Sequence, residues 1–340
     1  MENNKSAGVV CCIERGGLEY KGLCMILSLR RNWGAWSELP IYAYSPRSEN
    51  IISSWLREIY KEYNVTLIDE PINENYLDYP LANKPLSMAH AEKNLSEDLL
   101  IFLDSDILCW NEPDLFALPT GKDLGMVVDG TKTVASSGPS DFKYEPMWKS
   151  LYQIAGVEDS EPYVTTLLTN ELVRGWWSSG VIVCRRSASI MEKWLTVFHE
   201  SMKSSFFIPE SNYLREQMTI CAVAASIYNQ FLELPVSYNY PVQNFAHYTA
   251  RGTSPEVAAL WHYQPYMNKA FRLLRERMDR TSDISTKIRV ANDFITNVET
   301  KYPKMIGLDE SIVSRYRREL ALGPRLRKLI GRSKDTDPTI

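Results

Sequence analysis

The sequence lacks apolar runs long enough to cross a membrane, and its few cysteines follow no pattern of a metal or disulfide framework. The longest apolar stretches, such as residues 220–227, fall far short of the ~18 residues that a membrane-spanning helix needs. The first residues contain no apolar core of a signal peptide. The six cysteines form no CxxC pair, and Cys11, Cys109 and Cys184 sit in apolar, strand-like runs. We therefore expect a soluble, cytoplasmic protein without a zinc site or a disulfide framework.

The sequence also lacks a large excess of charge of one sign. It has 38 Lys and Arg residues against 42 Asp and Glu residues, a net charge of −4, which excludes a chain that is basic overall and binds nucleic acid. The charge is unevenly distributed. Residues 271–340 contain 16 basic and 10 acidic residues, a net charge of +6, whereas residues 1–270 have a net charge of −10. An acidic body with a basic tail indicates a surface partner for the tail.

The composition, with 44% hydrophobic and 24% charged residues, is that of a globular protein, and 340 residues allow one large domain or two modest ones. Apolar strands alternate with helix-period runs, which favours a parallel sheet covered by helices on both faces. Residues 130–174 are weakly patterned, and we interpret them as an insertion or lid. We expect strands at residues 8–13, 41–44, 65–68, 99–103, 123–129, 176–184 and 231–234. We expect helices at residues 18–32, 48–63, 83–94, 145–154, 187–204 and 213–227, and further Arg-rich helices after residue 267.

Two aspartates follow the most apolar of these strands. Asp104 and Asp106 come directly after residues 99–103, at the carboxyl end of a buried strand, where open α/β sheets bind ligands. Two carboxylates with water and phosphate oxygens suit Mg²⁺ or Mn²⁺, although Asp-Ser-Asp is also typical of a plain turn. Two reaction classes use such a strand end. One is the haloacid-dehalogenase-type phosphatase, in which Asp104 would be the nucleophile, and the other is the metal-dependent nucleotide-sugar glycosyltransferase.

Several segments, in this order, resemble the GT-A fold glycosyltransferases, most closely the retaining family 8 type that includes glycogenin and the lipopolysaccharide galactosyltransferases. The resemblance covers roughly residues 8–270, and no single motif decides it. The segments are residues 8–19, Lys84-Pro85-Leu86, Asp104-Ser105-Asp106, residues 177–183, Glu216-Gln217 and Trp261-His262-Tyr263. The chain departs from the family where Ser178 or Ser179 replaces an Asn, where Glu216 replaces an Asp, and where residues 264–269 replace a Gly-x-x-Lys-Pro-Trp tail.

The resemblance implies a GT-A-like, Rossmann-type mixed α/β sheet flanked by helices over residues 1–265, followed by a basic helical extension over residues 266–340. It implies that Asp104, Asp106 and His262 bind Mn²⁺ or Mg²⁺, a donor set that suits either ion. It assigns donor binding to Glu14, Lys84, Asp104, Ser179, Gly180 and Lys269. It places Glu216, Gln217 and Asp129 in catalytic positions, near the anomeric carbon and the sugar or acceptor hydroxyls.

The function that follows is transfer of a hexose from a nucleotide-sugar, with UDP-hexose favoured, to an acceptor hydroxyl, with retention of configuration. The acceptor is a glycan, a lipid-linked sugar or a small molecule, and no nucleic acid is a partner. Bacterial relatives with basic C-terminal segments imply peripheral contact of the tail with the inner membrane face. Two alternatives stay open: a phosphatase that uses Asp104, and a glycosyltransferase-like domain that binds nucleotide or glycan without turnover.

Overall fold

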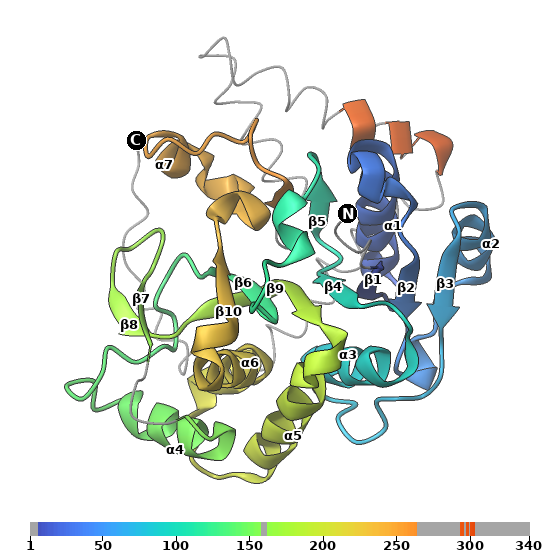
Figure 1. The fold of residues 1–340 in the computed structure, drawn as a ribbon. Coiled ribbons are helices and arrows are strands. Elements are labelled where there is room, and N and C mark those ends of the chain that lie inside the picture. The colour runs from blue at the N-terminus through green and yellow to red at the C-terminus, as the bar shows by residue number, and fades with distance from the viewer. Residues whose placement is uncertain (1–5, 158–161, 264–292, 296, 299, 303–340) are drawn as a thin grey trace, which may run out of the picture.

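A seven-stranded sheet runs through the middle of the molecule in the computed structural model (Figure 1), which describes residues 6–157, 162–263, 293–295, 297–298 and 300–302. Across the sheet the strands follow the order β10-β6-β9-β4-β1-β2-β3. They are β1 (Ala7–Cys12), β2 (Ile41–Tyr44), β3 (Val65–Ile68), β4 (Leu99–Leu103), β6 (Leu124–Val128), β9 (Trp177–Arg185) and β10 (Phe231–Leu234). The expected α/β class with a mixed, helix-flanked sheet is confirmed.

The direction of β9 differs from the parallel arrangement that the sequence pattern favoured. β4, β1, β2 and β3 run parallel, and so do β10 and β6, but β9 lies between the two groups and is antiparallel to both β4 and β6. All residues of β9 from Gly180 to Cys184 are buried. Its sequence is therefore a continuous apolar run, which does not reveal the direction of the strand. Its reversal brings the start of β9 to the sheet edge where β4 and β6 end.

Helices cover both faces of the sheet, as the alternation of strands and helices predicted. Successive residues of each strand face opposite cores: Val9 and Cys11 pack on one side of β1, and Val10 packs on the other. The first core includes α1 (Gly17–Asn32) and residues of α2 (Ser54–Glu62). The second includes residues of α3 (Asn83–Asn94), α4 (Glu145–Ala155), α5 (Ile190–Lys203) and α6 (Arg215–Ser226).

Two smaller sheets stand beside the main one. In the first, β12 (Leu260–His262) lies between β11 (Tyr240–Pro241), to which it is parallel, and β5 (Ile107–Cys109), to which it is antiparallel. The second pairs β7 (Tyr163–Thr165) with β8 (Leu172–Arg174). A short helix, α7 (Phe245–Thr249), lies between β11 and β12 along the chain. The first small sheet positions the C-terminal part of the site, because β5 starts three residues after Asp104.

One expectation about local structure was wrong. The helix predicted over residues 48–63 is interrupted: a 3₁₀ turn covers Ser48–Asn50 and α2 begins at Ser54. Two hydrogen bonds hold the segment between the 3₁₀ turn and α2 in place. The backbone N–H of Arg15 donates to the carbonyl oxygen of Asn50, and the backbone N–H of Ser53 donates to the Glu19 carboxylate.

The interpretation of residues 130–174 as an insertion or lid stays a prediction, but part of this segment packs into the core. Trp148 of α4 is fully buried in the second core, and its indole N–H donates to the carbonyl oxygen of Val134. Arg174 of β8 forms a buried ion pair with Glu145 of α4. The sequence did not predict this packing, because the residues around α4 are rich in Gly, Pro, Ser and Thr. Hydrophobic periodicity is informative only within regular helices and strands.

The described residues after position 292 pack against the body, near α1 in Figure 1. Phe294, Ile295 and Val298 are buried in the first core, and the ring of Phe294 meets Trp110 edge-on with a centroid separation of 6.4 Å. The basic residues from Arg315 onward lie outside the described residues. No helix in the described part of the chain is long and apolar enough to span a membrane. The boundary at residue 265, between the expected GT-A-like domain and the helical extension, stays a prediction.

Replacing Phe294 with alanine tests whether this C-terminal segment belongs to the folded core. We expect Phe294→Ala to lower the free energy of unfolding by about 3 kcal/mol, because a buried aromatic ring is removed from a packed cluster. Asp293→Ala, at the exposed neighbouring position, should change it by less than about 0.5 kcal/mol. Urea denaturation of both variants measures the difference, and equal effects would show that the segment does not contribute to the core.

Candidate active site

The two aspartates lie in a tight connection between β4 and β5. The backbone N–H of Asp104 donates to the carbonyl oxygen of Gly180, at 2.9 Å, and the N–H of Ile107 donates back to the carbonyl of Asp104, at 3.1 Å. His262 of β12 stands opposite Ile107 in the β5–β12 ladder. The His262 Nε2 atom therefore comes within 3.3 Å of Oδ1 of Asp106. Strand pairing, rather than sequence proximity, brings the imidazole to the carboxylates.

Asp104, Asp106 and His262 form a group whose potential ligand atoms lie within 4.8 Å of one another. Gly180 flanks this group so closely that a Cβ atom there would come within 2.9 Å of Cε1 of His262 and 3.3 Å of Oδ2 of Asp104. A side chain at position 180 would therefore intrude between the ring and the carboxylate. Two carboxylates and one imidazole suit Mn²⁺ or Mg²⁺, so both the donor set and the space kept by Gly180 fit a divalent cation.

Opposite charges set the protonation of this group. Burial raises the pKa of Asp104, although the Lys84 ammonium opposes that rise. Burial would also raise the pKa of Asp106, but His262 and Lys21 outweigh it and hold that pKa well below its ordinary value. Burial lowers the pKa of His262, yet the Asp106 carboxylate raises it above the ordinary value on balance.

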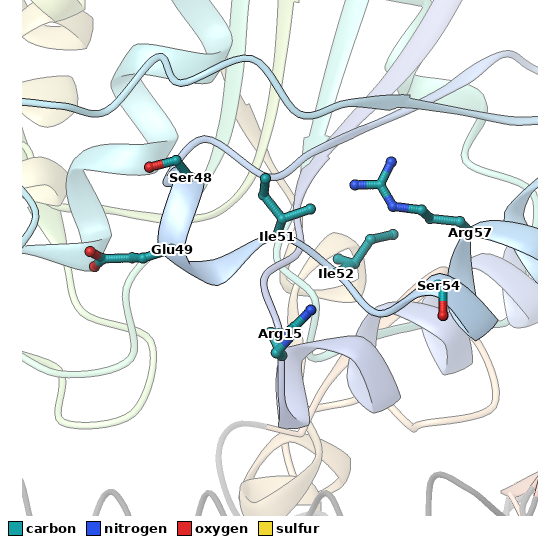
Figure 2. A pocket seen from close by; sticks show the side chains of 7 residues that line it. All are labelled: Arg15, Ser48, Glu49, Ile51, Ile52, Ser54 and Arg57. Atoms are coloured by element: carbon teal, nitrogen blue, oxygen red, sulfur yellow. The ribbon is translucent and has the colours of Figure 1, made fainter.

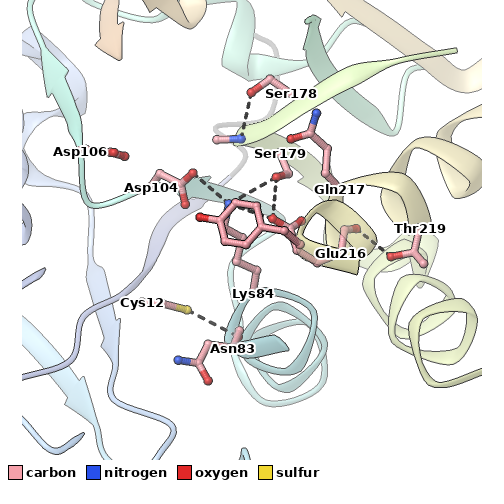
Figure 3. Close-up of polar contacts among 12 residues, drawn as sticks. Cys12, Asn83, Lys84, Asp104, Asp106, Ser178, Ser179, Glu216, Gln217 and Thr219 are labelled. Atoms are coloured by element: carbon pink, nitrogen blue, oxygen red, sulfur yellow. Dashed lines mark hydrogen bonds and ion pairs between the residues drawn. The ribbon is translucent and has the colours of Figure 1, made fainter. Parts of the chain in front are cut away.

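Lys84 links the aspartates to the start of α6 (Figure 3). Its ammonium lies 2.9 Å from Oδ2 of Asp104, 3.3 Å from Oε1 of Glu216 and 3.3 Å from the hydroxyl of Ser179. Ser179 in turn donates to Oε1 of Glu216, at 3.1 Å. Burial raises the pKa of Glu216, and its other oxygen, Oε2, is buried without a hydrogen-bond partner. One lysine therefore neutralises two carboxylates, the buried Glu216 and the partly exposed Asp104, and Oε2 of Glu216 keeps its lone pairs free.

Asp129 and Gln217 lie on the far side of β9 from Asp104. Asp129 follows β6, where its backbone N–H donates to the carbonyl of Trp176, and its Oδ2 accepts a hydrogen bond from the Gln217 amide at 3.0 Å. Burial raises the pKa of Asp129. The reversed β9 separates the two sets of acidic groups while keeping both at one edge of the sheet.

A cleft of about 220 Å³ opens beside these residues. Asp129, Ser178 and His262 contribute to one part of its lining. Asn239 and Tyr248 also contribute to the lining, and the Oδ1 atom of Asn239 and the hydroxyl of Tyr248 are buried without hydrogen-bond partners. Buried polar atoms without partners are rare, because each costs desolvation energy. The cleft therefore offers neutral hydrogen-bonding groups next to the candidate cation site.

A larger cavity, of about 440 Å³, lies near the start of α2 (Figure 2). Its lining is Arg15, Ser48, Glu49, Ile51, Ile52, Ser54 and Arg57. None of the residues predicted for the site is among them.

Two predicted donor-binding residues stand apart from the cluster. Glu14 is buried, and its carboxylate is held by an ion pair with Arg47 and a 2.9 Å hydrogen bond from the Asn83 amide. Both of its oxygens therefore already have partners. Lys269 lies outside the described residues.

Three residues of this region were not predicted from the sequence. Lys21 of α1 lies 3.6 Å from Oδ2 of Asp106, while Asn239 and Tyr248 line the cleft. The available signal for Lys21 was a single basic residue inside an otherwise apolar helical run, residues 20–29. No comparable signal marks Asn239 or Tyr248, because nothing in their neighbourhood in the sequence shows that a cleft forms there.

Comparison with protein families finds a match to the Rhodobacterales glycosyltransferase domain over residues 9–227. No curated protein matches the chain. Among solved structures, the bifunctional glycosyltransferase WbbM is similar at 13% identity, with a TM-score of 0.51 over 85% of this chain and 52% of WbbM. This chain thus spans about half the length of WbbM, and the similarity shows the fold.

Two further solved structures are less similar. The galactosyltransferase LgtC, in complex with donor and acceptor sugar analogues, has 14% identity and a TM-score of 0.47, covering 79% of this chain and 93% of LgtC. Mouse xyloside xylosyltransferase 1 has 12% identity and a TM-score of 0.44, covering 76% of this chain and 98% of that enzyme.

Removing the Lys84 charge should destabilise the protein, because Asp104 and Glu216 would lose their shared buried counter-ion. We expect Lys84→Met to lower the free energy of unfolding by about 3 kcal/mol, at the lower end for breaking a buried ion pair. Lys93→Met, at an exposed position of the same helix, should change it by less than about 0.5 kcal/mol. Thermal and urea denaturation measure both, and a Lys84→Met protein as stable as the Lys93→Met control would contradict the ion-pair geometry.

Proposed function

The chain belongs to the Rhodobacterales glycosyltransferase domain family, and we propose that it transfers a hexose from a nucleotide-sugar to an acceptor hydroxyl with the help of a divalent cation. Its activity is that of a glycosyltransferase. The proposal adds the donor class, UDP-hexose being favoured, the dependence on Mn²⁺ or Mg²⁺, and retention of configuration at the anomeric carbon. The single observation that carries it is the Asp104–Asp106–His262 group at the carboxyl end of β4.

In this proposal Asp104, Asp106 and His262 hold the cation, which when bound neutralises the charge of the leaving diphosphate as a Lewis acid. Lys84 keeps the Asp104 carboxylate oriented through its 2.9 Å ion pair. Gly180 keeps the space beside His262 open. Support for the cation comes from this donor set and from the missing side chain at position 180.

The donor would lie along the same edge of the sheet. Lys84 and Ser179 are proposed to bind the phosphate and sugar oxygens. Each would exchange a present partner for the ligand, because Lys84 contacts Asp104 and Glu216 and the Ser179 hydroxyl donates to Glu216. Glu14 keeps its assignment to the nucleoside only if Arg47 and Asn83 share its carboxylate with the ligand, because they hold both oxygens. Lys269 is assigned to the diphosphate on the sequence resemblance alone.

Glu216, Gln217 and Asp129 are proposed to act on the transferred sugar and the acceptor. The unpartnered Oε2 of Glu216 can accept a hydrogen bond from a sugar hydroxyl, and the Gln217 amide fixes the Asp129 carboxylate. Retention rests on the resemblance to family 8. The attacking acceptor hydroxyl then approaches on the face from which the diphosphate leaves.

The cleft beside Asp129 is the proposed place for the acceptor. Its unpartnered groups, the Asn239 amide oxygen and the Tyr248 hydroxyl, match the neutral hydroxyls of a sugar, which donate and accept hydrogen bonds. Because buried polar groups regain their lost hydrogen bonds on binding, a hydroxyl-rich acceptor is favoured over an apolar one. The proposal leaves the acceptor as a glycan, a lipid-linked sugar or a small molecule.

A cytoplasmic location, with contact between the basic tail and the inner membrane face, completes the proposal. Its support is the net charge of +6 over residues 271–340, since basic segments bind anionic lipid surfaces. Membership of a glycosyltransferase family favours sugar transfer over the phosphatase alternative, in which Asp104 would be phosphorylated.

Asparagine substitutions at the two aspartates test the cation site, because they keep the shape and remove the charge. With UDP or GDP and Mn²⁺, ligand at a hundred times its Kd should stabilise the wild-type protein by about 2.7 kcal/mol. We expect this stabilisation to require the cation, to disappear with EDTA, and to be lost together with donor turnover in Asp104→Asn and Asp106→Asn.

Asp78→Asn, at an exposed position, is the matched control and should behave as wild type. Thermal shift with each nucleotide, and the release of nucleoside diphosphate from each nucleotide-sugar, are the measurements. Full turnover in both aspartate variants would overturn the site assignment. Cation-dependent nucleotide binding without any turnover would instead indicate a binding domain.

A further inference from the structure

A buried lysine adjoins the candidate cation site and has no part in the function proposed above. Lys21 lies on the covered face of α1, with 6% of its surface exposed. Lysine is almost never buried this deeply without an ionic partner. Its ammonium lies 3.6 Å from Oδ2 of Asp106, and 6.0 Å from the centre of the Tyr263 ring.

The two oxygens of Asp106 face different positive groups. Oδ1 is 3.3 Å from His262, and Oδ2 is 3.6 Å from Lys21. Lys84 occupies a different position, because it is paired with Asp104 and Glu216. A divalent cation bound to Asp106 would therefore share that carboxylate with the Lys21 ammonium. The cation and the ammonium would be close together, and both are positively charged.

Like charges at such range repel strongly inside a protein, where the effective dielectric constant is far below that of water. An anion with several negative charges that binds beside both cations offsets this repulsion by attracting both, and a nucleoside diphosphate is such an anion. The lysine side chain is a flexible four-carbon chain with a compact ammonium. It can therefore move from a carboxylate to a phosphate oxygen without displacing the helix.

We propose that Lys21 is a positioning residue that couples cation binding to donor binding. It holds Asp106 while the site has no cation, opposes a cation that arrives alone, and pairs with the diphosphate once both ligands are present. The coupling deepens the function proposed above and rests on it. Because such coupling is reciprocal, the cation strengthens nucleotide binding by the same factor by which the nucleotide strengthens cation binding.

The test uses the full-length protein and two titrations. Mn²⁺ is titrated with and without saturating UDP, with free Mn²⁺ followed by electron paramagnetic resonance, and UDP is titrated with and without Mn²⁺ by calorimetry. In Lys21→Met we expect Mn²⁺ alone to bind several-fold more tightly than in wild type. We also expect the factor by which UDP strengthens Mn²⁺ binding to fall about tenfold.

Three further variants complete the design. Lys21→Arg keeps the charge and should keep the coupling. Lys21→Gln keeps a hydrogen-bond donor for Asp106, so it replaces Lys21→Met if the methionine variant does not fold. Lys93→Met removes an exposed lysine and should leave both titrations unchanged.

The outcomes separate this proposal from the one on which it rests. Coupling in wild type that is unchanged in both Lys21→Met and Lys21→Gln would overturn the role of Lys21 and leave the proposed function intact. Wild-type protein in which UDP has no effect on Mn²⁺ binding would overturn both. A purely structural Lys21 would lower the melting temperature without changing the coupling factor.

Discussion

The reversed direction of β9 is the constraint on which the rest of the site depends. Because β9 runs against β4 and β6, its first residues meet the ends of both strands: Val181 pairs with Leu103, and Trp177 pairs with Val128. The segment from Ser178 to Gly180 therefore lies between the two positions where acidic residues leave the sheet. A parallel strand in the same place would bring its other end there, and the glycine that accommodates His262 would lie far from the aspartates.

Around that edge the protein gathers charged side chains that are buried or only partly exposed. Lys84 is paired with Asp104 and Glu216, and Asp106 is paired with Lys21 and His262. Taking such groups out of water costs more than their attraction returns, unless each has a well-placed partner. Replacing a buried ion pair with apolar residues of the same shape is often neutral or stabilising. In the function proposed above, a cation and a diphosphate would together bring opposite charges to these groups.

The cleft combines two parts of the chain with different relations to known proteins. Asp129 and Ser178 lie within the residues matched to the family, whereas Asn239, Tyr248 and His262 come after residue 227, where the match ends. β12 ties this later segment to β5, directly beside the aspartates. The family match thus covers the main sheet except β10 and the first two residues of β1, together with Asp129 and Ser178 of the cleft. Asn239 and Tyr248 lie outside the family match, and in the function proposed above they would contribute to selectivity for the acceptor.

From the sequence alone, most strands and helices and the aspartate pair were predictable, because apolar periodicity and a charged strand end are local patterns. Lys84, Glu216 and His262, which the resemblance to family 8 implied, contact the aspartates or one another, and their roles stay a prediction. Three things were decided only by the tertiary structure: the direction of β9, the helical break at residues 51–53, and the burial of Lys21 against Asp106. A strand buried on both faces has the same pattern in either direction. The local sequence around a lysine in an apolar helix is the same whether its ammonium is in contact with water or with a carboxylate. Both depend on which surfaces meet, and that is determined by packing between segments far apart in the chain.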